Sequence, residues 1–299
     1  MIEPVLKHEA FLADVSSANH PGEDFRLWWL GQSGFLLQWQ GRHVLLDPYL
    51  SDSLTAKYAN TDKPHIRMTA KVIDPARLDF IDVVSASHLH TDHLDPETLK
   101  PLRSANAGLT LIVPEAIRNE AAARLGASPE GLLGLDDGQA ANASEFRFNG
   151  VASAHEILER DGAGHYRYLG YVVQFGYWTL YHSGDVVLYD GLLERLRRFP
   201  IDVALLPING RSPERRVAGN LNAREAAWLG RQMGARTVIP CHYEMFTFNT
   251  ACPEDFVTAA RELGQRADVP RCGARWESST LGCSAAPGYR TLRLSRKCT

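Results

Sequence analysis

Short apolar segments separated by turn residues dominate the first half of the chain and predict a β-meander followed by alternating strands and helices. The predicted strands cover 26–30, 35–39, 42–46, 82–87 and 109–113, and a predicted helix covers 114–125. Gln40–Gly41 lies between two of these strands and is typical of a hairpin turn. After the fourth strand, Asp95 and Pro96 predict a helix start, because Asp is a favoured N-cap and Pro fits the first helical position.

The second half repeats this order of elements. The predicted strands cover 146–153, 168–175, 178–182, 202–206, 237–240 and 289–294, and the predicted helices cover 188–198, 223–233 and 253–265. No linker rich in Pro, Gly or Ser separates the halves, so we expect one domain over 1–299 with its core at about 26–267. Two such halves can pack sheet against sheet with helices outside, which predicts an α/β fold with four layers, αββα, and two pseudo-duplicated halves. Apart from the short strand, 270–299 gives no prediction.

Composition and charge narrow the classes of function. Hydrophobic residues make up 44% and charged residues 22% of the chain, which excludes disordered and fibrous classes. The formal net charge of −3 argues against a broad basic surface, so we expect no nucleic-acid partner. No apolar run is long enough to cross a bilayer and no signal segment is visible, so no membrane partner is expected. The five cysteines include no Cys-x-x-Cys pair, which favours reduced thiols and a cytoplasmic location.

The densest cluster of candidate chemistry lies directly after the fourth predicted strand. It contains His88, His90, Asp92 and His93. His88 and His90 project to the same side of an extended segment, and the other two can face a second position close by. Neutral imidazoles together with a carboxylate suit zinc, manganese, iron or nickel. The pattern therefore predicts a metal site in a strand-to-helix loop.

Three further positions strengthen this interpretation, and each lies where an apolar strand ends. They are His155, Asp185 and His242. Loops at the ends of strands are where scaffold proteins place reactive groups. Because their side chains match the donor types of the cluster, we interpret them as candidate ligands of the same site.

The ordered set of His-x-His-x-Asp-His, a later His, an Asp in a Ser-Gly-Asp turn and a final His resembles the metallo-β-lactamase superfamily. The resemblance spans Trp28 to about Phe256. Finer features are similar to the branch that includes L-ascorbate-6-phosphate lactonase and related lipid phosphodiesterases. These features are the stretches 28–35, 46–48, 181–185, 201–205 and 240–243. The stretch Ala154-His155-Glu156 fits the general superfamily pattern better than the lactonase branch, so the substrate stays open.

The resemblance implies a four-layer metallo-β-lactamase fold and a dinuclear metal site. Its ligands would be His88, His90 and His155 for the first ion, Asp92, His93 and His242 for the second, and Asp185 as the bridge. Two divalent ions are implied, zinc or manganese first, with iron or nickel as alternatives. A bridging hydroxide would attack an ester, lactone or phosphodiester bond, with Asp92 and Asp185 as catalytic residues. Asp47 and His182 are candidates for holding ligand imidazoles in one tautomer.

A polar segment after the strand 202–206 is expected on the same rim as the ligands. Together with a tyrosine beside the last ligand, it supplies the candidate substrate-binding residues Asn209, Arg211, Arg215, Arg216 and Tyr243. Arginine suits bidentate contact with phosphate or carboxylate, so we expect a small anionic substrate. Arg211→Ala is expected to weaken catalysis on anionic substrates about ten- to a hundredfold and to spare a neutral ester.

Other functions remain open on the same fold. An oxygenase-like non-heme iron enzyme could use the first ion alone, although a diiron relative should carry a carboxylate where this chain has three imidazoles. A nuclease of the superfamily is a further alternative, and the near-neutral charge argues against it. A purely structural metal is disfavoured because structural sites are often rich in thiolates, and none of the cysteines joins this pattern. A homo-oligomer also stays open.

Overall fold

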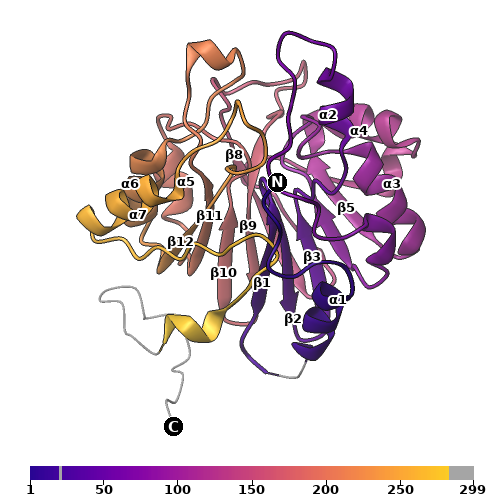
Figure 1. Ribbon diagram of the computed structural model, residues 1–299, viewed down its shortest axis with the longest axis horizontal. Helices are drawn as coiled ribbons and strands as arrows, with labels where there is room; N and C mark the ends of the chain where they lie inside the picture. Colours follow the sequence, from indigo (N-terminus) through magenta and orange to yellow (C-terminus); the bar gives the residue numbers. More distant parts are fainter. Residues whose placement is uncertain (20–21, 283–299) are drawn as a thin grey trace.

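The computed structural model describes residues 1–19 and 22–282, and it contains two mixed β-sheets flanked by helices (Figure 1). The first sheet has the strand order β13-β1-β2-β3-β4-β5-β6, and the second has the order β12-β11-β10-β9-β8-β7. The first sheet consists of β1 (Arg26–Gly31), β2 (Gly34–Trp39), β3 (Arg42–Leu46), β4 (Val83–Ser85), β5 (Thr110–Pro114), β6 (Leu132–Leu135) and β13 (Arg275–Glu277). The second consists of β7 (Ala140–Ala143), β8 (Phe146–Ala152), β9 (Leu169–Phe175), β10 (Trp178–His182), β11 (Val203–Pro207) and β12 (Thr237–Cys241).

Helices connect and cover these strands. The α-helices are α1 (His8–Ser17), α2 (Ser53–Tyr58), α3 (Pro96–Ala105), α4 (Arg118–Leu125), α5 (Leu192–Leu196), α6 (Ala223–Met233) and α7 (Pro253–Glu262). The short 3-10 turns are η1 (Pro75–Arg77), η2 (Glu115–Ile117), η3 (Pro129–Gly131), η4 (Pro213–Arg215) and η5 (Ser278–Leu281). No helix in the described ranges combines the length and the apolar character that a membrane crossing requires.

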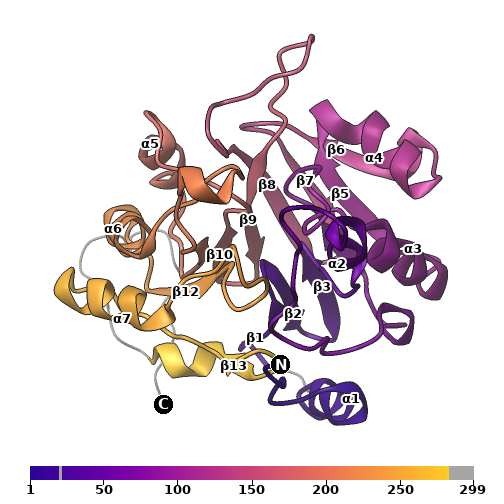
Figure 2. The ribbon, with the colours of Figure 1, turned by 45° about the horizontal axis from the view of Figure 1, so that its top comes forward.

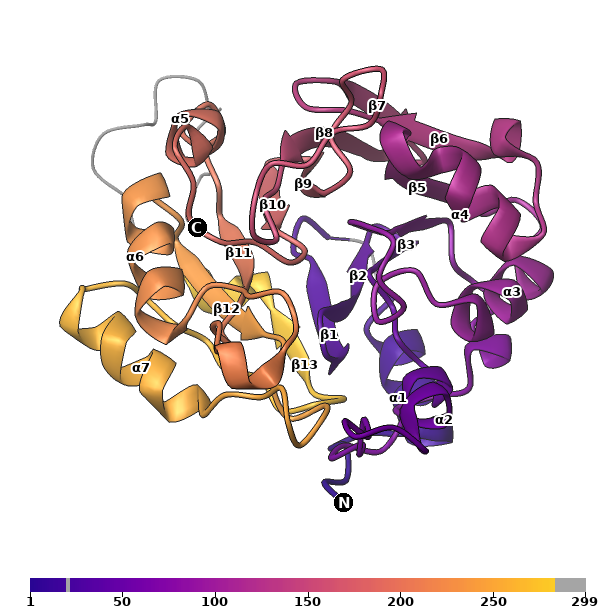
Figure 3. The same cartoon turned by 90° about the horizontal axis from the view of Figure 1, so that it is seen from above.

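The two sheets repeat one plan, as the sequence predicts. In the first, β1, β2 and β3 pair antiparallel, and β3 to β6 pair parallel. In the second, β7 to β10 pair antiparallel, and β10, β11 and β12 pair parallel. Figure 3 shows α3 and α4 on one outer side and α5, α6 and α7 on the other, with the strands between them. The four-layer αββα arrangement is therefore confirmed.

Local sequence signals explain where several elements begin. The side chain of Asp95 accepts hydrogen bonds from the backbone N–H groups of Glu97 and Thr98, so the predicted cap of α3 is confirmed. At α6, Asn222 and Glu225 form a reciprocal capping box. The predicted helix 188–198 is shorter than expected: it covers Leu192–Leu196, and Gly191 before it has φ +95°, outside the helical region.

Some elements carry no clear signal in the sequence. The prediction misses the helices α1 and α2 and the strands β6, β7 and β13. The three strands are short or low in β-branched residues, such as Ala140–Ala143 in β7. The predicted strand 289–294 lies outside the described residues. The sequence makes no prediction for 275–277, which forms β13 and pairs antiparallel with β1 at the edge of the first sheet (Figure 2). Trp276 of β13 packs on Phe25, with ring centroids 5.6 Å apart.

Candidate metal centre

The candidate ligands lie on loops at the carboxyl ends of strands from both sheets. The loop with His88, His90, Asp92 and His93 follows β4, whereas the other ligands follow β8, β10 and β12. The loop after β10 can approach the first sheet because it contains Gly184, with φ +59°. A Cβ added at Gly184 would lie 2.4 Å from Ser87 Cβ, so no other residue fits without displacement. The sandwich thus brings residues from both halves of the chain to one place.

All seven predicted ligands gather into two adjacent groups. The first ligand group is His88, His90, His155 and Asp185, and the second ligand group is Asp92, His93 and His242. Within each group the ligand atoms lie within 4.8 Å of one another. Oδ2 of Asp185 lies 3.3 Å from His155 Nε2, in the first group. Its Oδ1 lies 3.3 Å from His93 Nε2 and 3.4 Å from His242 Nε2, so this carboxylate lies between the two groups.

The chemistry of these side chains fits divalent ions. Nε2 of His88, Nε2 of His93 and Oδ1 of Asp185 are buried and have no hydrogen-bond partner among the described residues. A buried polar atom left unsatisfied costs about 1–3 kcal/mol, so such atoms are rare without a reason. Here they converge with other imidazole and carboxylate atoms, and one cation in each ligand group would satisfy them. Each group could therefore hold one ion of the zinc, manganese or iron type.

Asp47 lies behind the second ligand group. Its Oδ2 lies 2.5 Å from His93 Nδ1 and accepts a hydrogen bond from the Ser87 hydroxyl, and its Oδ1 accepts one from the Ser87 backbone N–H. A carboxylate on Nδ1 fixes the tautomer that leaves Nε2 of His93 free for an ion. Asp47 also has φ +41°, a strained backbone conformation of the kind that gathers at functional sites.

His155 is held by a backbone group from another loop. Its Nδ1–H donates to the carbonyl oxygen of Gly219 at 2.9 Å, which directs Nε2 toward the first ligand group. Gly219 in turn packs closely on Arg211, because an added Cβ would lie 2.3 Å from Arg211 Cβ. The loop between β11 and α6 therefore contributes to the site by orienting His155.

Gly219→Ala is expected to weaken ion binding by the first ligand group about ten- to a hundredfold, because the new methyl group must push the Gly219 carbonyl away from His155. A chelator-competition titration of the full chain would measure this change. Gly108→Ala is the matched control, since a Cβ there meets no atom within 4 Å. Equal ion affinity in the two variants would show that this carbonyl does not orient His155.

Buried charges strongly shift the ionisation of the ligands. Burial, followed by the neighbouring imidazoles of His93 and His90, lowers the pKa of His88 well below its ordinary value. Burial also lowers the pKa values of His242 and His93, but the nearby carboxylates, first that of Asp185 and then that of Asp92, raise these pKa values by more. They raise the pKa of His242 to about 9 and that of His93 well above its ordinary value. Because an imidazole must be neutral to bind an ion, ion binding must displace protons from this site.

The other predicted site residues have different surroundings. His182 is fully buried, and its Nε2–H donates to the carbonyl oxygen of Ser33 at 3.0 Å rather than to a ligand imidazole. Tyr243 is 2% exposed and packs on Trp29, with ring centroids 4.5 Å apart. Its surroundings favour a packing role over contact with a substrate.

The predicted substrate-binding loop lies on the ligand rim, but its side chains already have partners. Arg211 pairs with Glu225 on α6. Arg215 donates to the carbonyl oxygens of Asn209 and Thr250, and the Asn209 amide donates to Asn249 Oδ1 at 2.9 Å. Arg216 pairs at 2.7 Å with Asp62, which lies on the loop after α2. This loop and the loop after α2 both lie at the top of Figure 1.

Two residues that the prediction misses also border the ligands. The ring centroid of Tyr168, just before β9, lies 5.0 Å from that of His88 and 5.8 Å from that of His155. The side-chain Nε2 of Gln32 lies 2.8 Å from Asp92 Oδ2 and 3.1 Å from His242 Nε2. A polar residue in a short turn between two largely apolar predicted strands is the signal that could have identified Gln32. Tyr168 carries no comparable signal.

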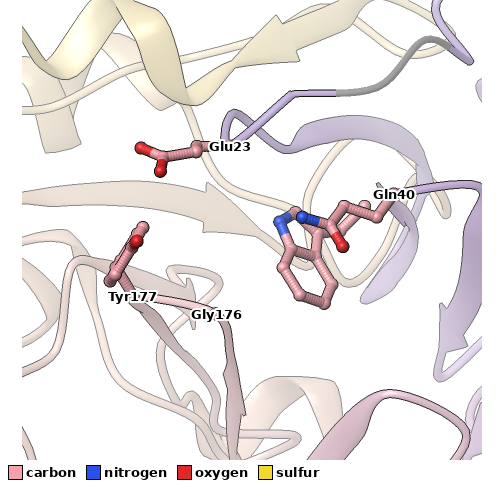
Figure 4. A pocket seen from close by; sticks show the side chains of 5 residues that line it. Glu23, Gln40, Gly176 and Tyr177 are labelled. Atoms are coloured by element: carbon pink, nitrogen blue, oxygen red, sulfur yellow. The ribbon is translucent and has the colours of Figure 1, made fainter.

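A cavity elsewhere in the molecule is separate from these ligands. It has a volume of about 280 Å³ and is lined by Glu23, Trp39, Gln40, Gly176 and Tyr177 (Figure 4). Trp39 and Gln40 lie at the β2–β3 turn, Gly176 and Tyr177 lie at the β9–β10 turn, and Glu23 precedes β1, whereas the ligand Asp185 follows the opposite end of β10. The cavity is therefore at the other end of the sheets from the candidate metal centre.

Two packed mixed sheets, helices on both outer sides and a His- and Asp-rich site at the strand ends define a protein of the metallo-β-lactamase fold. The family model described as beta-lactamase superfamily domain matches residues 42–243, and the chain belongs to this family. A UPF0173 metal-dependent hydrolase from Rubrobacter xylanophilus is 27% identical over 250 residues, which cover 82% of this chain and 92% of that protein.

Solved structures share the fold at lower sequence identity. Igni18, a metallo hydrolase from Ignicoccus hospitalis, has a TM-score of 0.62 at 20% identity, covering 85% of this chain and 98% of its own. CmlA, a diiron β-hydroxylase from Streptomyces venezuelae, has a TM-score of 0.63 at 15% identity, covering 86% of this chain and 54% of its own. At these identities the similarity shows the fold alone, and it includes proteins with different reactions.

Proposed function

We propose that the protein is a metal-dependent hydrolase with two divalent ions, which cleaves an ester, lactone or phosphodiester bond of a small anionic substrate. The observation that carries the proposal is the position of Asp185 between two ligand groups, with one oxygen toward each. His90 is exposed, so the centre is open to solvent on one side, as a catalytic site requires. The name of the Rubrobacter xylanophilus relative supports the same reaction class.

Two divalent ions would supply Lewis acidity and a water of lowered pKa for attack at neutral pH. The side chains of this protein would hold the ligand imidazoles in place and accept a proton. Asp47 and the Gly219 carbonyl keep His93 and His155 in the tautomers that present Nε2. Asp92 belongs to the second ligand group and is partly exposed, so the carboxylate oxygen that does not bind the ion can receive a proton during bond cleavage. Tyr168 packs beside the imidazoles of His88 and His155, with ring centroids 5.0 and 5.8 Å away.

Among the loop arginines, the geometry favours Arg216 for contact with an anionic substrate. The side chains of Arg216 and its partner Asp62 are 61% and 75% exposed, so solvent screens their attraction and a ligand can compete for it. Arg211, in contrast, pairs with the capping-box residue Glu225. Arg215 is bound to backbone carbonyls.

Arg216→Ala is expected to lower kcat/KM on an anionic substrate about two- to fivefold and to leave a neutral ester unchanged, because a charge pair at an exposed position contributes about 0.2–1 kcal/mol. Parallel kinetics on one charged and one neutral substrate would measure the difference. Arg224→Ala is the matched control, since Arg224 forms a similarly exposed ion pair with Glu262, between α6 and α7. If the two variants show the same substrate preference, Arg216 does not select charge.

Metal analysis of the purified chain tests the proposed function directly. After removal and restoration of zinc or manganese, lactones, phosphomonoesters and phosphodiesters should be screened for hydrolysis. We expect two ions per chain and metal-dependent turnover in at least one class. Absence of metal binding would contradict the proposal.

An iron-dependent redox reaction is the second candidate function, because the diiron β-hydroxylase CmlA shares this fold. In this chain the protein ligands of the first group are three imidazoles and the shared Asp185, a donor set that also suits iron. Iron in the purified protein together with oxygen consumption would favour this candidate over the hydrolase. The proposed hydrolase requires neither.

A further inference from the structure

We propose that Gln32 is a further ligand of the second ion position, binding the ion through its side-chain oxygen. The inference rests on the proposed function, because it concerns an ion at the second ligand group. Gln32 lies in the turn between β1 and β2, and its side chain is fully buried. Gln32 is not among the seven ligands that the sequence predicts.

The backbone of Gln32 is hydrogen-bonded to His242 of the second ligand group. Its carbonyl oxygen accepts hydrogen bonds from the His242 backbone N–H and from the Trp29 indole, both at 2.9 Å. Gln32 and His242 both have left-handed backbone conformations, with φ +51° and +63°. Each is strained for a residue with a side chain, and their mutual hydrogen bond holds both in place. The side chain of Gln32 is therefore directed at the ligand group by a fixed turn.

The side-chain amide lies on two of the ligand atoms that an ion would use. Its Nε2 is 2.8 Å from Asp92 Oδ2 and 3.1 Å from His242 Nε2. Its Oε1 is buried and has no hydrogen-bond partner among the described residues. A cation at the second ligand group needs the Asp92 and His242 atoms, and the N–H₂ group cannot remain on them. Rotation about the last side-chain bond exchanges the two ends of the amide and presents the unsatisfied oxygen in their place.

This exchange changes the character of the second position. With Gln32, the ion would be bound by oxygens of Asp92, Asp185 and Gln32 and by two imidazoles, whereas the first group has three imidazoles and one carboxylate. Amide and carboxylate oxygens suit harder ions such as manganese, and imidazole-rich sites suit zinc. The two positions should therefore differ in metal preference, with manganese favoured at the second.

Titration of the metal-stripped full chain with MnCl₂, followed by calorimetry and by electron paramagnetic resonance, tests the inference without any substrate. Gln32→Met keeps the length of the side chain and removes its oxygen. We expect the second equivalent of Mn²⁺ to bind about tenfold more weakly or worse, with the first equivalent unchanged. If the amide were only an obstacle to the ion, Gln32→Met would instead bind the second equivalent more tightly, and that result would overturn the inference.

Gln38→Met is the matched control. Gln38 lies in β2, is also buried, donates to the Val15 carbonyl oxygen at 2.9 Å and has an Oε1 without a hydrogen-bond partner among the described residues, but it is not near a ligand. Its substitution should leave both equivalents of Mn²⁺ unchanged.

Gln32→Glu provides an independent measurement in case Gln32→Met does not fold, because it keeps an oxygen of the same reach. Its second equivalent of Mn²⁺ should bind at least as tightly as in the wild type, and a weaker second equivalent would contradict the inference. If the wild type binds no Mn²⁺ and no Zn²⁺, the proposed function fails along with the inference. If the wild type binds two ions and Gln32→Met binds them with the same affinities, the inference alone fails.

Discussion

Asp185→Asn is expected to lose at least one of the two ions and about a thousandfold in kcat/KM, the largest effect of any single substitution in this chain. One oxygen of Asp185 lies 3.3 Å from His155 Nε2 and the other 3.3 Å from His93 Nε2, so this carboxylate is shared by both ligand groups. Asparagine keeps the shape, but it replaces one oxygen by an N–H₂ group and removes the negative charge that both ions would share.

Metal content after dialysis and steady-state kinetics on a substrate found by screening would measure the effect of Asp185→Asn. Asp82→Asn is the matched control, because Asp82 accepts the His43 backbone N–H at 2.8 Å and pairs with Arg42 just before β4, at the end of that strand away from the ligands. An Asp185→Asn variant that keeps two ions and nearly full activity would exclude Asp185 as the bridge.

The second large effect is a dependence of metal stabilisation on pH. In the metal-free protein, the carboxylate of Asp185 and its neighbours raise the pKa of His242 to about 9, from an ordinary value of 6.5, although burial opposes this. A folded-state pKa above the unfolded value means that the proton stabilises the fold below pH 6.5 and that this contribution is lost as the pH rises through about 9. His93 follows the same direction.

Bound ions reverse this trend, because protons compete with them for the same imidazoles and the competition weakens as the pH rises. The increase in Tm on adding Zn²⁺ or Mn²⁺ should therefore be larger at about pH 8.5 than at about pH 6, by a difference on the order of 5 °C. Thermal unfolding with metal and with a chelator, across this range, would measure it.

His242→Gln should reduce this pH dependence, and the raised pKa of His93 accounts for the part that remains. His165→Gln should not reduce it, since His165 lies 3.4 Å from Asp161 and away from the ligand groups. A metal-induced increase in Tm that becomes smaller as the pH rises across this range would contradict the assignment of His242 as a protonated residue that the ion displaces.

The sequence predicts the site more completely than it predicts the elements around it. The ligands are recognisable because each strand that carries one ends in a chemically distinct residue, such as His155 shortly after the buried end of β8. Their convergence depends on packing between the sheets. The close contact between Gly184 and Ser87 is part of this packing, and no local sequence pattern predicts it. Tyr168 could not be predicted for the same reason, because only the packing of the fold brings its ring close to His88.

For the arginine-rich loop 209–216, the sequence predicts the position but not the partners of the side chains. Its composition indicates anion binding, and the sequence places it on the correct rim. The partners of its side chains, however, are supplied by distant segments: Glu225 for Arg211 and Asp62 for Arg216. Charge patterns along one segment predict what that segment could bind, but they do not reveal which of its charges the fold has already neutralised.

The pairing of β13 with β1 has a consequence for how the chain is made. Arg26 pairs with Glu277, so the partner of β1 leaves the ribosome roughly 250 residues after β1 itself. Until then the outer edge of the first sheet exposes unpaired backbone N–H and C=O groups, together with Phe25, which Trp276 later covers. Until β13 is made, this edge can pair wrongly with another chain, and β13 is the element that ends this exposure.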